Sequence, residues 1–181
     1  MEYIDTFITK SGKEIKFRYP TIDDAESLKN YINKISAEQS FLLLQGFQNT
    51  TESETNWLKD KLEKISKNQS VYLCGFCDDQ LVACAEVELG IEAKSHVGNF
   101  GISVALDFRG FGIGEKIMEL VIAESIKTMP EIKIIDLECF SQNKIAQNLY
   151  RKLGFIEYGK LPTGLKRKGQ FDDAIYMYKQ F

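Results

Sequence analysis

Apolar residues recur at helical spacing in four stretches of the chain. In the second stretch they fall at positions 57, 58, 62 and 65, and Thr51 with Glu54 just before them has the spacing of a capping box. The third stretch ends before Pro130 and the fourth at Gly154, which are typical helix stops. We therefore predict four helices, over residues 21–35, 51–67, 112–129 and 141–153.

Runs of alternating or continuous apolar residues separate these helices and predict strands. Two such runs flank the acidic turn at 78–80 and predict a hairpin. Residues 41–50, FLLLQGFQNT, predict an apolar loop or short helix that either packs in the core or lines a ligand pocket. The basic segment 161–170 predicts a loop between the last two strands. The predicted strands cover residues 14–20, 70–77, 81–90, 96–106, 132–140, 155–161 and 171–181.

The order of these elements indicates a single domain. A strand is followed by two helices, three strands, a helix, a strand, a helix and two strands, with no repeats or linkers between them. This order predicts one mixed α/β (α+β) domain that covers residues 1–181.

Length and composition limit the classes of protein. The 181 residues, 44% hydrophobic and 27% charged, suit one domain with an ordinary core. No apolar run approaches the roughly 20 residues of a membrane span. Residues 1–10 lack a signal-peptide pattern, so we expect a cytoplasmic protein that does not act on membranes. The net charge of −3 argues against nucleic acid as a partner and is compatible with a cationic small molecule.

Four cysteines raise the question of a metal or redox site. Cys74 and Cys77 match the C-x-x-C spacing, but they fall in a predicted strand, where an odd offset points two side chains to opposite faces. Cys84 and Cys139 also fall in strand-like runs. We therefore expect buried, free thiols rather than a zinc site or a disulfide.

Three alternating glycines, Gly110, Gly112 and Gly114, lie between a predicted strand and a predicted helix. Backbone N–H groups at a helix N-terminus bind anions, and glycine lets a phosphate approach the backbone closely. Arg109 places a cation beside the turn. The segment therefore predicts a phosphate site, and a turn that only needs positive φ angles is the alternative.

The surrounding residues restrict the kind of phosphate site. A P-loop signature is absent, and the dinucleotide pattern G-x-G-x-x-G fails because Glu115 stands at its last glycine. Asp136 follows about 20 residues later, as a ribose-binding acid would. The turn nevertheless comes too late in the chain for the long βαβαβ unit of a nicotinamide site, so that alternative is weak.

Together with its neighbours, the turn resembles the GNAT superfamily of N-acetyltransferases. Its pattern is R-x-x-G-x-G, and a second family pattern, N-x-x-A-x-x-L-Y-x-x-x-G-F, occurs whole at residues 143–155. The resemblance covers about residues 81–178. It implies a central mixed, mostly antiparallel sheet of six to seven strands flanked by about four helices. It also implies acetyl-CoA as the co-substrate, with no metal.

The resemblance further implies roles for particular residues. The glycine turn would hold the pyrophosphate of acetyl-CoA, and the strand before it would pair with pantetheine and supply an N–H near Val104 to the oxyanion. Tyr150 would protonate the departing thiolate, unless it is only a core aromatic residue on the same stripe as Leu149. Asn143 would hydrogen-bond the cofactor. The expected cofactor-binding set is Ile102, Ser103, Val104, Arg109, Gly110, Phe111, Gly112, Ile113, Gly114, Asn143 and Tyr150.

The sequence leaves several candidates for the general base. His96, the only histidine, begins the predicted strand before the turn, where many family members carry a carboxylate. Glu86 and Glu88 share one face of the neighbouring predicted strand. A surface role is the alternative for each of them, and proton removal through water needs no dedicated base. The predicted catalytic residues are Tyr150, His96 and Glu86.

The predicted function follows from these parts. The chain would transfer the acetyl group of acetyl-CoA to the primary amine of a small molecule, by direct attack in a ternary complex. The alternatives are a protein N-terminal or lysine acetyltransferase and a non-catalytic acyl-CoA-binding module. Dimers are common in the family, so a homodimer is compatible with the resemblance.

Overall fold

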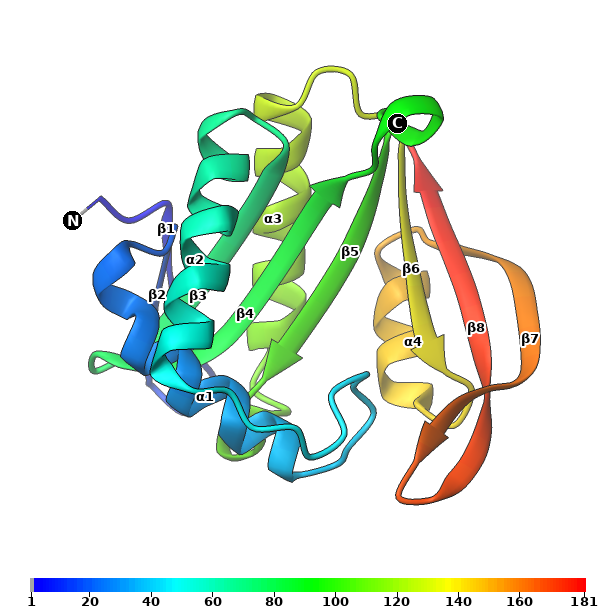
Figure 1. Cartoon of the computed structure of the whole chain (residues 1–181), viewed down its shortest axis with the longest axis horizontal. Helices are drawn as coiled ribbons and strands as arrows, with labels where there is room; N and C mark the ends of the chain where they lie inside the picture. The colour runs from blue at the N-terminus through cyan, green and yellow to red at the C-terminus, as the bar shows by residue number, and fades with distance from the viewer. Residues whose placement is uncertain (1) are drawn as a thin grey trace.

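The computed structural model describes residues 2–181 and contains one eight-stranded sheet (Figure 1). The strands lie in the order β1-β2-β3-β4-β5-β6-β8-β7, and every neighbouring pair is antiparallel except β5 with β6. The mixed, mostly antiparallel sheet agrees with the prediction, although the predicted count of six to seven strands was too low. The strands are β1 Asp5–Ile8, β2 Glu14–Arg18, β3 Ser70–Cys77, β4 Gln80–Leu89, β5 Val97–Val104, β6 Ile134–Phe140, β7 Ile156–Arg167 and β8 Gln170–Gln180.

Four α-helices cover the two faces of the sheet. α1 and α2 lie on one face, and α3 and α4 lie on the other (Figure 1). Helix α2 begins after Thr50, whose hydroxyl accepts the Ser53 N–H at 3.1 Å, so the predicted capping box at Thr51 and Glu54 is displaced by one residue. The helices are α1 Ala25–Ala37, α2 Thr51–Ser66, α3 Ile113–Thr128 and α4 Lys144–Lys152, with short 3-10 turns at Ile22–Asp24, Glu92–Lys94 and Leu106–Phe108.

Two strands differ from the prediction. β1 was missed, because its four residues alternate between half-buried and exposed and pair only with β2 at the edge of the sheet. β7 continues through most of the predicted basic loop, so the turn to β8 consists only of Lys168 and Gly169, both with positive φ angles. A register shift between Leu161 and Leu165 accommodates the Pro-Thr-Gly segment within the strand. Turn-forming residues therefore mark an irregularity in β7 and not its end.

Strands β5 and β6 diverge soon after they pair. β4 pairs with β5 along seven positions, from Ala83–Val104 to Leu89–Gly98. β5 pairs with β6 at only three positions, the last of which is Asn99–Asp136. Beyond that pair the two strands separate (Figure 1). The rest of β5, up to Val104, therefore has a sheet neighbour on one side only.

The interior contains all four cysteines. They are buried and free, as predicted, and the Cys74 and Cys84 sulfur atoms on β3 and β4 lie 4.0 Å apart. Within residues 2–181, no group of three or more potential His, Cys, Asp or Glu ligands could hold a metal ion. Over the same described range, no helix is long and apolar enough to cross a membrane.

Candidate active site

The glycine turn between β5 and α3 has the geometry of an anion-binding site. Gly110 and Gly112 have φ angles of 80° and 85°, which glycine adopts without strain. Gly112 is the N-cap of α3, and no side chain caps the helix, so its first backbone N–H groups are available to a ligand. A Cβ atom built on Gly110 would meet nothing within 4 Å. The turn therefore offers backbone N–H groups to an anion, as the predicted phosphate site requires.

The Arg109 side chain is engaged within the protein. Its Nε donates to the Val104 carbonyl at 2.8 Å, and a terminal nitrogen donates to Glu38 Oε2 at 2.6 Å. Glu38 follows α1, where its carboxylate faces the negative end of the helix dipole. Arg109 thus fixes the turn against β5 and α1, and these two bonds use only two of the five N–H donors of its guanidinium.

The open edge of β5 presents two residues to the gap between β5 and β6. The Ala105 N–H donates to the Val82 carbonyl on the β4 side. Because backbone groups alternate in direction along a strand, the N–H groups of Ile102 and Val104 point the other way, toward the gap. These two N–H groups lie on the strand that leads directly into the glycine turn. The predicted pairing with pantetheine therefore narrows to Ile102 and Val104.

Two predicted cofactor residues use polar groups inside the protein. The backbone N–H and C=O groups of Ser103 point opposite to those of Ile102 and Val104, so they face β4. The Ser103 hydroxyl lies 2.9 Å from the Tyr31 hydroxyl on α1. Asn143 is the N-cap of α4, where its Oδ1 accepts the Ala146 N–H at 3.2 Å. Asn143 keeps its amide NH₂ group for a ligand, whereas Ser103 does not face the gap.

Tyr150 on α4 is both a core residue and an available phenol. Its ring packs edge-on against Phe100 of β5, with centroids 6.2 Å apart, and the residue is only 6% exposed. Burial raises the pKa of its hydroxyl, the charge of Cys139 adds to the shift, and no hydrogen bond from a described residue opposes it. The phenol therefore keeps its proton at neutral pH and has no competing partner among residues 2–181.

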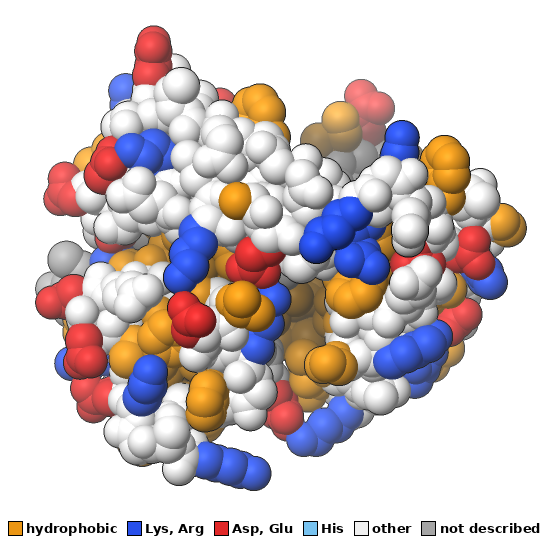
Figure 2. All heavy atoms as spheres, turned by 90° about the horizontal axis from the view of Figure 1, so that it is seen from below, with side chains coloured by type: hydrophobic (Ala, Val, Ile, Leu, Met, Phe, Trp, Pro, Cys, Tyr) orange, Lys and Arg blue, Asp and Glu red, His pale blue; other side chains and the backbone are white. Residues whose placement is uncertain are grey.

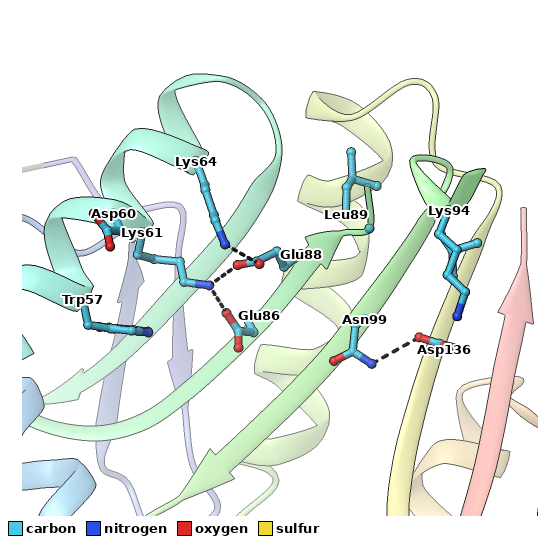
Figure 3. A pocket seen from close by; sticks show the side chains of 12 residues that line it. Trp57, Asp60, Lys61, Lys64, Glu86, Glu88, Leu89, Lys94, Asn99 and Asp136 are labelled. Carbon is cyan, nitrogen blue, oxygen red and sulfur yellow. Dashed lines mark hydrogen bonds and ion pairs between the residues drawn. The ribbon is translucent and has the colours of Figure 1, made fainter. Parts of the chain in front are cut away.

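A buried lysine organises the glutamates of β4. Lys61 of α2, with 6% of its side chain exposed, donates to Glu86 Oε2 at 2.6 Å and to Glu88 Oε2 at 2.5 Å, and Lys64 donates to Glu88 Oε1 at 2.6 Å (Figure 3). Burial of Lys61 favours its neutral form, but the two carboxylates outweigh this effect and raise its pKa. Glu86 and Glu88 thus share one face, as predicted, and both are held toward α2.

Glu86 retains one free oxygen beside β5. The residue pairs across the sheet with Gly101, and a Cβ at Gly101 would lie 3.8 Å from Glu86 Oε1. Its other oxygen is bound by Lys61, whereas Oε1 has no hydrogen-bond partner in residues 2–181. The absent side chain at Gly101 therefore leaves this oxygen exposed just past the point where β5 and β6 diverge.

A cavity of about 570 Å³ opens beside these carboxylates, between α2 and strands β4, β5 and β6 (Figure 3). We call it the α2–β6 cavity. Its charged side chains carry both signs, and its volume is that of a small-molecule site. It is lined by Trp57, Asp60, Lys61, Lys64, Glu86, Glu88, Leu89, Gly90, Lys94, Val97, Asn99 and Asp136.

His96 lies at the end of β5 that is far from the glycine turn. Its side chain is exposed before β5, and its carbonyl accepts the Lys133 and Ile134 N–H groups. Ile102 is six residues further along, about 20 Å at roughly 3.3 Å per strand residue. This position does not favour His96 as the general base, so Glu86 is the predicted base that lies nearest the gap.

Segment 41–50 forms a loop that reaches the far side of the diverging strands. The Phe41 ring lies 5.8 Å from that of Phe140 at the end of β6, and the Arg167 guanidinium of β7 lies 4.3 Å from it. Seen from below, the surface of the molecule is hollowed, with apolar side chains inside and charged side chains of both signs around the hollow (Figure 2). The loop thus narrows one entrance to the gap.

Two parts of the site were missed in the sequence. Lys61 stands in the apolar stripe of α2, between Leu58 and Ile65, and a charged residue in such a stripe was a readable signal. Gly101 has a role only because the register of β4 and β5 places it opposite Glu86. No pattern within β5 alone reveals that pairing.

Comparison with known proteins decides the family. A model of the acetyltransferase (GNAT) family matches residues 36–155. The chain belongs to the GNAT acetyltransferase family. This GNAT chain is 32% identical over 107 residues to the L-amino acid N-acetyltransferase AaaT of Escherichia coli K12. The match covers 54% of this chain and 65% of that relative, so it spans less than two thirds of AaaT.

Solved structures share the GNAT fold. An acetyltransferase of the GNAT family from Streptococcus pneumoniae has a TM-score of 0.84 at 22% identity, with 92% of this chain and 99% of that chain covered. The structure of yncA from Salmonella typhimurium with its cofactor acetyl-CoA has a TM-score of 0.80 at 15% identity, with 92% and 93% covered. At these identities the likeness shows the fold alone. The family resemblance drawn from two short motifs is confirmed.

Proposed function

We propose that this GNAT protein transfers the acetyl group of acetyl-CoA to the primary amine of a small molecule. The observation that carries the proposal is the gap between β5 and β6. The free N–H groups of Ile102 and Val104 line it, and the backbone anion site at Gly110 and Gly112 lies at its end. A thin extended chain attached to a diphosphate fits this arrangement, and acetyl-CoA is such a molecule.

The chemistry uses few groups. The amine nitrogen attacks the thioester carbonyl, and a backbone N–H of β5 stabilises the developing oxyanion. The N–C bond forms in this attack, and the C–S bond breaks when the tetrahedral intermediate collapses. Tyr150 gives its proton to the sulfur and regains one from solvent, since its raised pKa keeps the phenol protonated beforehand.

Glu86 is the group that we assign to the amine. Its Oε1 is free and lies over Gly101, so it accepts a hydrogen bond from an incoming ammonium. The excess proton of the amine leaves to this carboxylate or to water in the α2–β6 cavity. Lys61 keeps the carboxylate in place through the other oxygen.

A small acceptor agrees better with the surroundings than a peptide does. The α2–β6 cavity has the volume of a small-molecule site, and Phe41 narrows the lower entrance by its contacts with Phe140 and Arg167. AaaT is named for L-amino acids, so amino acids belong among the first acceptors to test.

The test is thiol release from acetyl-CoA with a panel of small amines, amino acids and peptides, each product being identified by mass. We expect small primary amines to accelerate thiol release and peptides not to. Acceleration by peptides alone would replace the small-molecule acceptor with a protein substrate. Tight acetyl-CoA binding without turnover for any amine would make the protein a binding module and overturn the proposal.

A further inference from the structure

The sheet face that carries the α2–β6 cavity continues onto β6, β8 and β7, beyond the part that α1 and α2 cover. α1 and α2 lie over the β2–β5 part of this face, while α4 lies behind β6 (Figure 1). The register places Asp136 opposite Tyr178 and Glu138 opposite Tyr176 on this face, and Tyr158 of β7 packs against both tyrosine rings. Two carboxylates and three phenol rings thus share one exposed surface.

The carboxylates and the rings are in direct register. A hydrogen bond to Glu138, with smaller effects of burial and charge, raises the pKa of Tyr176, and burial with the charges of Asp136 and Glu138 raises that of Tyr158. Asn99 donates to Asp136 at 3.2 Å. Within residues 2–181, neither Asp136 nor Glu138 forms an ion pair with Lys or Arg. Lys94 lines the same cavity as Asp136 (Figure 3).

The two walls of the gap carry matching carboxylates. Gly101 on β5 and Glu138 on β6 each lie two residues past the last strand pair, Asn99–Asp136, so they stand at the same height on opposite sides. Glu86 lies over Gly101 on the β5 side of the gap, and Glu138 lies on β6 on the other side. A molecule in the gap therefore meets a carboxylate on each side.

The carboxylates of β4 and β6 differ in their ion pairs. Glu86 and Glu88 are matched by Lys61 and Lys64, whereas Asp136 and Glu138 have no ion-pair partner in the described chain. Aromatic rings beside a carboxylate favour a cation, because a ring face attracts positive charge and displaces water from around it.

We propose that the acceptor is a small amine with a second positive charge, which Glu138 and Asp136 bind among Tyr158, Tyr176 and Tyr178. The class is that of diamines and basic amino acids. One amine group reaches the thioester beside Glu86, and the second cation lies against the β6 wall. This inference rests on the proposed function and names the substrate class of the same site.

The test compares acceptors of equal length that differ in one charge: putrescine with butylamine, and lysine with norleucine. We expect the doubly cationic member of each pair to have a KM about tenfold lower, as for one charge-assisted hydrogen bond. Glu138→Gln should remove most of this advantage and leave the KM of butylamine unchanged. Asp136→Asn should also reduce the KM advantage of the doubly cationic acceptor.

The matched control is Glu157→Gln. Glu157 lies on neighbouring β7, beside α4, where it pairs with Arg151, so the advantage of the diamine should persist. Equal KM values for the paired acceptors in the wild type would overturn the inference, as would equal effects of Glu138→Gln on both members. If no amine is turned over, calorimetry of putrescine and butylamine with the CoA-bound protein still tests the inference apart from the proposed function.

Discussion

The two faces of the sheet contribute to the site in different ways. On the face of α3 and α4 the predicted donor site consists mainly of backbone, namely a glycine turn, a helix N-terminus and the open edge of β5, joined by the Asn143 and Tyr150 side chains of α4. On the face of α1 and α2 the proposed acceptor site consists of side chains. Among them, Lys61, Glu86 and Glu138 come from three separate elements. One face offers the same backbone groups whatever the side chains are, while the other depends on particular side chains.

This difference separates what such proteins share from what distinguishes them. A backbone cradle needs only glycine and a strand-to-helix turn, which a short contiguous motif encodes. A side-chain pocket assembled from distant elements changes with any one substitution. Substitutions on the first face should therefore affect the donor and the chemistry, and those on the second should affect the acceptor and stability.

The largest effect is expected for Tyr150→Phe. Loss of the phenol removes the proposed acid, so kcat should fall roughly a thousandfold, within the usual range for general acid catalysis. Acetyl-CoA affinity and thermal stability should change little, because the hydroxyl has no partner in the described chain. Steady-state kinetics and a melting curve measure both.

Tyr31→Phe is the matched control on the opposite face. Tyr31 is also buried, but its hydroxyl bonds Ser103, so its loss should cost about 1 kcal/mol of stability with kcat changed only severalfold. Equal kcat losses for the two variants would show that Tyr150 acts through packing and not as an acid.

The next largest effect is expected for Lys61→Met. It leaves Glu86 and Glu88 without their buried cation, so the free energy of unfolding should fall by about 3 kcal/mol. Lys64→Met, at a lysine that is 45% exposed, should cost less than about 1 kcal/mol. Urea denaturation distinguishes the two. A Lys61→Met protein as stable as Lys64→Met would contradict the role that we give to the buried pair.

The ion pairs of Glu88 with Lys61 and Lys64 predict how the stability of the fold changes with pH. Burial opposes ionisation of Glu88, but hydrogen bonds from Lys61 and Lys64 outweigh it and lower its pKa below 4.5. A carboxyl group with a lowered pKa stabilises the fold above its unfolded pKa, and this contribution disappears as pH falls through the folded value. The wild type should therefore lose stability below about pH 4.5, and Lys61→Met should lose less over that interval.

The smallest effect is expected for Gly110→Ala, compared with Gly12→Ala. Both glycines have φ near 80°, and a Cβ at either would meet nothing within 4 Å, so both changes should cost about 1 kcal/mol of stability. Only Gly110→Ala should weaken acetyl-CoA binding, by about tenfold, because only there would a phosphate approach the backbone. Equal dissociation constants by calorimetry would place the diphosphate elsewhere.

The sequence predicted most of the fold for a physical reason. Helices α1 to α4 and the central strands have apolar patterns that are long enough to be recognised despite single exceptions. Strand β1 is too short to have such a pattern, and its stability comes from pairing with β2. The predicted basic loop became part of β7 because pairing with β8 overrides local turn propensity.

The candidate site was predictable to the extent that it is local in sequence. The glycine turn and the α4 motif are contiguous, so their placement followed from the pattern. The partners of Glu86 could not be deduced, because Lys61 and Gly101 join it only through helix packing and strand register. His96 precedes β5 at the end away from the glycine turn, a position that the strand pattern alone did not weigh.

The separation of β5 from β6 has a consequence for self-association. Exposed strand edges tend to recruit other chains, and sheets usually protect the edges at their rims. Here an unpaired edge at Ile102 and Val104 lies within the sheet, recessed between β5 and β6. Strands of other chains add at the rim of a sheet, and this edge is not at the rim. The fold can therefore keep one permanently unsatisfied edge for a ligand without exposing it to aggregation.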